Sequence, residues 1–294
     1  MKRADFIKSS AFTMAAALLP ASGIPQNEPE KNVNQVNKNP LKIGVMTYNI
    51  AKDWDIDTII KNLSEAEYQT VELRTTHAHR IEVDLPAAKR SEVKKRFIDS
   101  PLESISLASA FQYHSPDQAE LRKNIDGTKE YIKLAKDVGA TGIRVFGNAL
   151  PDNVPEEKTM QQIGRALAEV GEFGYNNGVE VRICVHGSKT NKPSVIRKII
   201  DYSGSPHVWV NWNCNPEDTD EKGFEENFSL LCKRIKGVHM HELWMADYPY
   251  RRLFRLLSDN SYKGYCNAEI EGNPEPVRFL KYYRALFLAY QDAI

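Results

Sequence analysis

Polar and ionisable side chains recur at every second position at the ends of five short apolar segments. Successive side chains of an extended strand alternate between its faces, so the members of each set share one face. Carboxylates, imidazoles and thiols are the groups that transfer protons and bind metal ions in enzymes. Five such sets exceed what ion pairs or loop caps account for, and they predict a functional pocket. The sets are Glu72 with Arg74; Arg182, Cys184 and His186; Asn211, Asn213 and Asn215; His239 with His241; and Asn267, Glu269 and Glu271.

A repeated order of short apolar strand, polar loop and amphipathic helix must position these sets. Strands that alternate with longer helices indicate a parallel sheet with right-handed crossovers. Eight such units between Leu41 and Ile294 match the (β/α)8 TIM barrel, an α/β fold in which active sites lie at the carboxyl ends of the strands. An open doubly wound sheet is the alternative, but no glycine-rich phosphate motif follows the first strand. The expected strands are 42–50, 70–74, 105–109, 142–148, 179–185, 207–212, 236–241 and 265–270.

The composition is that of a globular protein without a charge excess. Of the 294 residues, 41% are hydrophobic and 27% are charged, with 39 basic and 39 acidic side chains. Nucleic-acid binders usually carry a basic excess, so a nucleic-acid partner is not expected. No apolar run reaches the roughly 18 residues that span a bilayer, so no membrane span is expected either. The predicted partner is a small molecule, and the sequence makes no prediction of oligomeric state.

The first residues have the pattern of a secretory signal. A positive start at Lys2, Arg3 and Lys8 precedes the apolar run Ala11 to Leu19, and small residues follow at 21–23. This order predicts a signal peptide over 1–23 and export, to the periplasm. Residues 24–40 are rich in Asn, Pro, Glu, Gln and Lys, which predicts a flexible linker. A single TIM-barrel domain is then expected over 41–294.

Four short motifs follow one another at the expected strand ends: RICVHG (182–187), WNCN (212–215), VHMHE (238–242) and NAEIE (267–271). Their order and placement resemble the xylose isomerase-like barrel superfamily, which includes sugar isomerases and epimerases. The resemblance extends from Leu41 onward. It implies a sugar or keto-sugar isomerase or epimerase that transfers a proton next to a carbonyl, with a small-molecule carbohydrate as substrate.

The resemblance also implies a metal site, which this sequence alters. Sugar epimerases of the superfamily hold a divalent metal with a Glu, an Asp, a His and a second Glu. The matching positions here are Cys184, Asn213, His239 and Glu269, so two carboxylates are missing. Hard ions prefer carboxylate oxygens, whereas a thiolate and an imidazole suit Zn²⁺. The alternatives are one divalent metal, Zn²⁺ or Mn²⁺, and a metal-free site.

The resemblance places the acid–base roles on Glu269 and Cys184. His186 matches a substrate-contacting His, and the remaining predicted substrate-binding residues are Glu72, Arg74, Asn211, Asn215 and His241. Three tryptophans near strand ends are candidates either to stack on a sugar ring or to pack in the core: Trp54, Trp212 and Trp244.

Other interpretations stay open at this stage. The same carbanion can expel a leaving group, which would make the protein a keto-glycoside lyase acting by β-elimination. Loss of two ligand carboxylates also fits a non-catalytic carbohydrate-binding protein. Cys214 is a conceivable disulfide partner of Cys184, although four scattered cysteines do not form a disulfide framework.

Overall fold

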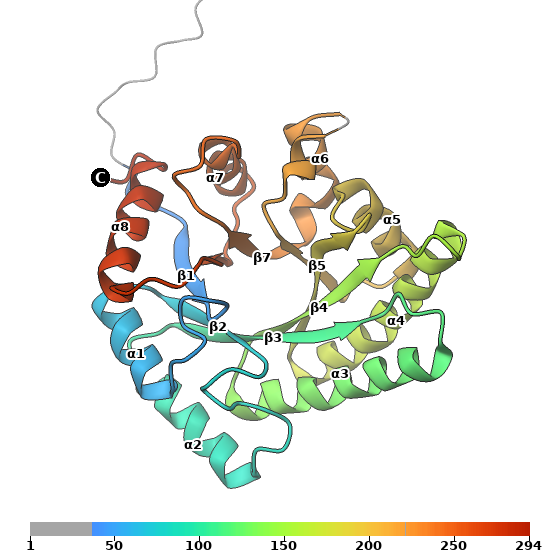
Figure 1. Cartoon of the computed structure of the whole chain (residues 1–294), viewed down its shortest axis with the longest axis horizontal. Coiled ribbons are helices and arrows are strands. Elements are labelled where there is room, and N and C mark those ends of the chain that lie inside the picture. The colour runs from blue at the N-terminus through green and yellow to red at the C-terminus, as the bar shows by residue number, and fades with distance from the viewer. Residues whose placement is uncertain (1–36, 221) are drawn as a thin grey trace, which may run out of the picture. The chain divides into compact units, whose positions relative to one another are not determined.

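The computed structural model describes residues 37–220 and 222–294, and within them parallel strands β1 to β8 close into a barrel in sequence order (Figure 1). Closure comes from the pairing of β1 with β8, in which Gly44 lies opposite Asn267. The predicted (β/α)8 barrel is therefore confirmed. The strands are β1 (Lys42–Met46), β2 (Thr70–Arg74), β3 (Ser104–Gln112), β4 (Gly142–Ala149), β5 (Glu180–Ser188), β6 (Val208–Trp212), β7 (Ile235–Met240) and β8 (Tyr265–Ala268).

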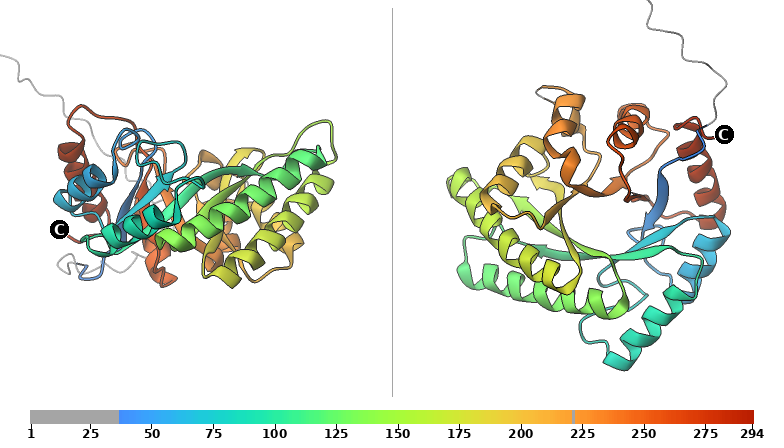
Figure 2. Two further views of the ribbon diagram at one scale, coloured as in Figure 1. Left: turned by 90° about the horizontal axis from the view of Figure 1, so that it is seen from below. Right: turned by 180° about the vertical axis from the view of Figure 1, so that it is seen from behind.

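A helix follows each strand and lies outside the barrel, and Figure 2 shows this arrangement from two further sides. Two 3₁₀ helices, η1 (Pro216–Thr219) and η2 (Cys232–Arg234), flank the sixth helix. The α-helices are α1 (Ile56–Glu65), α2 (Ala87–Ile98), α3 (Gln118–Val138), α4 (Glu156–Asn177), α5 (Pro193–Ser203), α6 (Phe224–Leu231), α7 (Tyr250–Asp259) and α8 (Pro276–Ala289).

Local sequence signals set the helix ends. Asp55 caps α1: its side chain accepts a hydrogen bond from the Thr58 backbone N–H at 2.8 Å and satisfies one of the unpaired donors of the first turn. Gly139 and Gly178 end α3 and α4 with φ of 79° and 71°. Glycine adopts this left-handed conformation without the steric cost that a Cβ would add. The chain therefore turns sharply into β4 and β5.

Alternation along β4 divides its side chains between two environments. Ile143 and Val145 are fully buried in the main hydrophobic core, which the strands share with the helices. Arg144 and Phe146 occupy the other face, which points into the barrel. Burying the apolar face fixes the register of each strand. The polar residues on the opposite face are thereby directed into the barrel.

β1 and β8 end several residues earlier than the sequence pattern suggests, and β7 ends one residue earlier. β1 ends at Met46 rather than at residue 50, although Thr47 still donates its backbone N–H to the Glu72 carbonyl at 2.9 Å. β8 ends at Ala268, and the Glu269 N–H continues the ladder to the Met240 carbonyl at 2.8 Å. Glu269 consequently sits just past the strand end, where a loop opens to solvent.

The amino-terminal predictions fall mainly outside the described residues. The predicted signal peptide, and the linker as far as residue 36, lie in that part of the chain. At the first described residues, the Asn37 backbone N–H donates a hydrogen bond to the Asp292 carbonyl at 2.7 Å, and the Leu41 N–H donates to Gln291 Oε1 at 2.7 Å. Among the helices of residues 37–220 and 222–294, none has the length and hydropathy needed to cross a bilayer.

Candidate active site at the carboxyl end of the barrel

His239 lies between two carboxylates inside the barrel. The ring is fully buried, with Nε2 3.0 Å from Glu72 Oε1 and Nδ1 3.2 Å from Glu269 Oε2. Burial by itself lowers the pKa of His239, but the charges of Glu72 and then Glu269 outweigh it and hold that pKa well above its ordinary value. His239 is therefore an imidazolium that donates from both nitrogens.

Glu72 is the buried member of this group. Its side chain is only 1% exposed and also accepts hydrogen bonds from Asn267 Nδ2 and Ser106 Oγ, both at 3.3 Å. Burial opposes ionisation, yet His239 and then Arg144 hold the pKa of Glu72 below its ordinary value. Glu72 is thus a fixed anion that orients His239.

Glu269 is the member that reaches solvent. Its side chain is 17% exposed and lines a cavity at the strand ends. Burial raises its pKa, but the charge and hydrogen bond of His239, with a further contribution from Arg144, lower the pKa of Glu269 to about 2. Glu269 is consequently ionised at neutral pH and can accept a proton from a molecule in that cavity.

The cavity has a volume of about 390 Å³. It receives side chains from the ends of β5 to β8 and from the loop after β1, as expected for an active site of this fold. Five predicted site residues line it: His186, Asn213, Asn215, His241 and Glu269. Tyr48, Glu242, Ile270 and Glu271 complete the lining.

The other predicted site residues do not line this cavity. Glu72, Cys184, Asn211 and His239 are buried. Arg74 is half-buried at the end of β2, with Nη1 3.2 Å from His77 Nε2. The structure therefore divides the predicted set into residues that line the cavity and residues that lie outside its lining.

A short chain of neutral polar groups connects β5 and β6. Asn211 Nδ2 lies 3.7 Å from Cys184 Sγ, and the thiol donates to Asn213 Oδ1 at 3.4 Å. Asn213 Oδ1 is also 3.3 Å from His239 Nδ1, and its Nδ2 donates to Asn215 Oδ1 at 3.0 Å. Cys184 is thereby placed as a buried support for Asn213.

Arg144 also belongs to the site, although it is not among the polar residues that the strand-end pattern predicts. The side chain is 4% exposed, its Cζ lies 4.0 Å from the centre of the Phe146 ring, and its Nε has no hydrogen-bond partner among the described residues. Its charge lowers the pKa of both carboxylates described above. Its alternation with the core residues Ile143 and Val145 is the sequence signal that places Arg144 on the inner face.

Arg182 lies on the inner face of β5 with Cys184, but its guanidinium points toward the amino-terminal end of the barrel, away from the cavity that Glu269 lines. Its Nη2 lies 2.7 Å from Glu180 Oε2, at the first residue of that strand. The long side chain allows the guanidinium to turn toward this early carboxylate. Period-two alternation alone does not reveal such a reversal.

Residues 60–283 match the family model described as "Xylose isomerase-like TIM barrel". The chain belongs to this family. Among curated proteins, none matches the sequence. Solved structures with the same fold include L-ribulose 3-epimerase, with a TM-score of 0.72 and 16% identity over 86% of this chain and 95% of that one. The 3-keto-D-glucoside 4-epimerase from E. coli has a TM-score of 0.69 and 15% identity over 85% and 99%. At these identities the likeness shows the fold alone.

The four positions that family resemblance assigns to a metal do not fit one well in this xylose isomerase-like barrel. An IOLI protein of the same fold was solved with zinc, with a TM-score of 0.64 and 12% identity over 86% of this chain and 95% of that one. Here, no group of three or more His, Cys, Asp and Glu side chains is placed to hold a metal ion within the described ranges. Asn213 is neutral, and both ring nitrogens of His239 face carboxylates. This donor set contrasts with the carboxylate oxygens that hard divalent ions prefer.

The structure shows the state of the cysteines and the packing of two of the three candidate tryptophans. All four cysteines are free, so the Cys184–Cys214 disulfide is not formed. Trp212 is fully buried, donates from Nε1 to the Tyr248 hydroxyl at 2.8 Å and packs edge-on against Phe228. It belongs to the core, whereas Trp244 is 71% exposed.

Proposed function

We propose that this xylose isomerase-like barrel is a sugar or keto-sugar isomerase or epimerase, with Glu269 as the group that takes a proton from the carbon next to a carbonyl. The observation that carries the proposal is the placement of Glu269: an ionised carboxylate that faces the cavity and is held from behind by a buried imidazolium. A fixed carboxylate in a pocket is the arrangement that general-base catalysis requires.

Charge balance supports the step. Before reaction, Glu72 and Glu269 carry two negative charges, and His239 and Arg144 carry two positive charges. When Glu269 accepts the proton, the four groups together become positive by one charge as the substrate becomes a negative enolate. The positive potential then stabilises the enolate, and this compensates for the weak basicity of a carboxylate whose pKa is about 2.

A second group for proton return comes from another side of the cavity. His186 follows Cys184 by two residues on β5, which does not neighbour β8 in the barrel. Burial, and then the charge of Arg144, lower the pKa of His186, so its ring is neutral and able to accept or relay a proton. Cys184, the predicted second acid–base group, is buried and outside the cavity lining, which makes His186 the better-placed candidate.

The remaining residues that line the cavity would bind the hydroxyl groups of the sugar. His241, Asn215 and Tyr48 present ring nitrogens, an amide and a phenol around the cavity. Such groups exchange hydrogen bonds with sugar hydroxyls and fix which carbon lies beside Glu269. The proposed substrate is therefore a small polyhydroxylated carbonyl compound.

Incubation with a panel of free ketopentoses and ketohexoses tests the proposal, with the sugars analysed by NMR. We expect at least one sugar to give its epimer or isomer with the wild-type protein and with Glu130→Gln, an exposed control on α3, but not with Glu269→Gln. Conversion by the Glu269→Gln variant at the wild-type rate would overturn the role of Glu269.

A non-catalytic carbohydrate-binding protein is the second candidate. The amide of Asn213 and the thiol of Cys184, at positions where the family's epimerases have carboxylates, favour it. Saturable sugar binding without any conversion would support this candidate over an isomerase. An unsaturated product from a keto-glycoside would instead identify a lyase.

We also propose that the protein acts outside the cytoplasm, on the basis of the signal-like residues 1–23 and the linker that follows. The barrel would then meet its substrate in the periplasm.

A further inference from the structure

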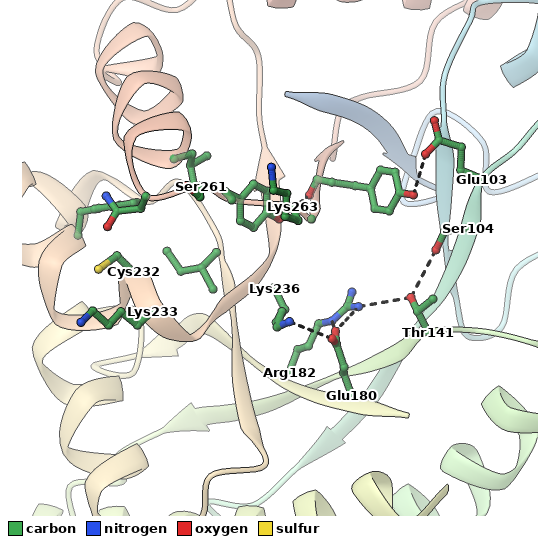
Figure 3. Close-up of a pocket in the computed structure, with 17 residues that line it drawn as sticks. Glu103, Ser104, Thr141, Glu180, Arg182, Cys232, Lys233, Lys236, Ser261 and Lys263 are labelled. Carbon is green, nitrogen blue, oxygen red and sulfur yellow. Dashed lines mark hydrogen bonds and ion pairs between the residues drawn. The ribbon is translucent and has the colours of Figure 1, made fainter. Parts of the chain in front are cut away.

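A second cavity opens at the opposite end of the barrel from Glu269. Its volume is about 470 Å³, and it is formed where strands begin rather than where they end (Figure 3). Ser104 starts β3, Glu180 starts β5, and Tyr265 starts β8. In parallel strands these first residues all lie at the amino-terminal end of the barrel. This cavity is therefore separate from the proposed catalytic site.

Arg182 is the buried cation of this cavity. Its side chain is 10% exposed, Nε and Nη2 donate to Glu180 Oε2 at 3.0 and 2.7 Å, and Nη2 also lies 3.4 Å from Thr141 Oγ1. Figure 3 shows these contacts on one side of the guanidinium. Nη1 forms no hydrogen bond with any residue that the structure describes. The arrangement holds the guanidinium rigid and leaves one nitrogen available to a ligand.

Positive charge exceeds negative charge around the cavity. Glu180 is shared, because Lys236 Nζ also lies 3.4 Å from its Oε1, and Glu103 is bound by Lys42 outside the lining. Two lining residues, Lys233 and Lys263, are exposed and form no ion pair with other described residues. The lining carries two carboxylates against four cations, namely Arg182, Lys233, Lys236 and Lys263. This excess of positive charge has no carboxylate partner among residues 37–220 and 222–294.

The remaining wall is suited to an organic molecule. Phe228, Ile235 and Leu257 provide an apolar side, while Ser261 and Tyr265 provide hydroxyls. We propose that this cavity binds a small organic anion through its carboxylate or phosphate group, with Arg182 Nη1 and the ammonium groups of Lys233 and Lys263 as donors. Planar guanidinium and ammonium groups are the common protein partners of both kinds of oxyanion. This binding is independent of the proposed isomerase activity.

Calorimetric titration of the full chain at low ionic strength tests the proposal. The probes are citrate, glucose 6-phosphate and inorganic phosphate. We expect saturable binding of at least one probe and a Kd raised by about tenfold or more in the double variant Lys233→Glu/Lys263→Glu, because the variant removes two charged donors and adds two negative charges at the cavity. Both lysines are exposed and outside ion pairs, so the variant should keep its fold, which circular dichroism verifies.

The matched control is Lys94→Glu/Lys158→Glu, which changes two other exposed lysines by the same charge. We expect its Kd to equal that of the wild type. Binding of citrate alone would identify a carboxylate site, and binding of a phosphate probe alone would identify a phosphate site. The proposal is overturned if none of the probes binds, if the control pair weakens binding equally, or if His186→Ala abolishes binding while the Lys233→Glu/Lys263→Glu variant retains it.

Discussion

Replacing Glu72 by Gln tests the buried charge array most selectively, because the change keeps the size of the side chain and removes its charge. The Glu72–His239 contact is 3.0 Å long and fully buried. Removing one partner of a buried ion pair costs about 3–5 kcal/mol when the other charge is left alone. Glu269 still faces His239 in this variant, so we expect a loss of about 2–3 kcal/mol. For a domain of this size that is a fall in Tm of roughly 5–10 °C.

The pH dependence identifies the cause of this loss. The pKa of Glu72 is lowered in the folded protein, so its contribution to stability is present above its ordinary value of 4.5 and is lost as the pH falls through the lowered pKa. The Tm difference between wild type and Glu72→Gln should therefore be full at pH 6–7 and shrink toward pH 3. Glu130→Gln, which removes an exposed pair with Lys133, should change Tm by less than about 2 °C. A Tm difference that is absent, or constant with pH, would refute the buried array.

Three further predictions concern other parts of the chain. Asp218 is buried, and burial raises its pKa from 3.8 to about 8, so the stability due to its protonated form is full below pH 3.8 and is lost progressively as the pH rises toward 8. Asp218→Asn should flatten that fall in Tm between about pH 4 and pH 8, and an unchanged profile would contradict this. The double variant Cys184→Glu/Asn213→Asp adds two carboxylates at the positions that the family resemblance assigns to a metal. Elemental analysis after dialysis should find about one Mn²⁺ per chain in this variant and none in the wild type. Metal in the wild type, or none in the variant, would contradict the conclusion that the wild-type side chains do not suit a hard divalent ion. Secreted protein should lack residues 1–23 by mass spectrometry, and an intact amino terminus would argue against export.

Much of the fold follows from patterns that the sequence displays directly. Apolar alternation locates β4 through Ile143 and Val145, and the strand–helix repeat predicts the closed barrel. Glu269, His186 and Asn213 were predicted to share a pocket because strand ends in a parallel barrel converge, and the structure brings them together.

The rest depends on three-dimensional packing that no local pattern encodes. The strand-end pattern indicates a substrate contact for Glu72, whereas the structure buries Glu72 against His239, 167 residues away in the sequence. Arg182 was expected beside Cys184 but turns toward Glu180 because a long side chain can reach either end of its strand. Arg144 was overlooked, since a charged residue in a central strand becomes meaningful only beside its carboxylates.

Deuterium exchange from solvent is the most direct test of proton transfer by Glu269. The protein is incubated in D2O with each ketopentose and ketohexose, and the carbon next to the carbonyl is observed by NMR. The account predicts deuterium at that carbon of at least one sugar with wild type, and a loss of at least about a hundredfold in the exchange rate with Glu269→Gln, as expected when a general base is removed. Exchange that continues unchanged in Glu269→Gln would contradict it.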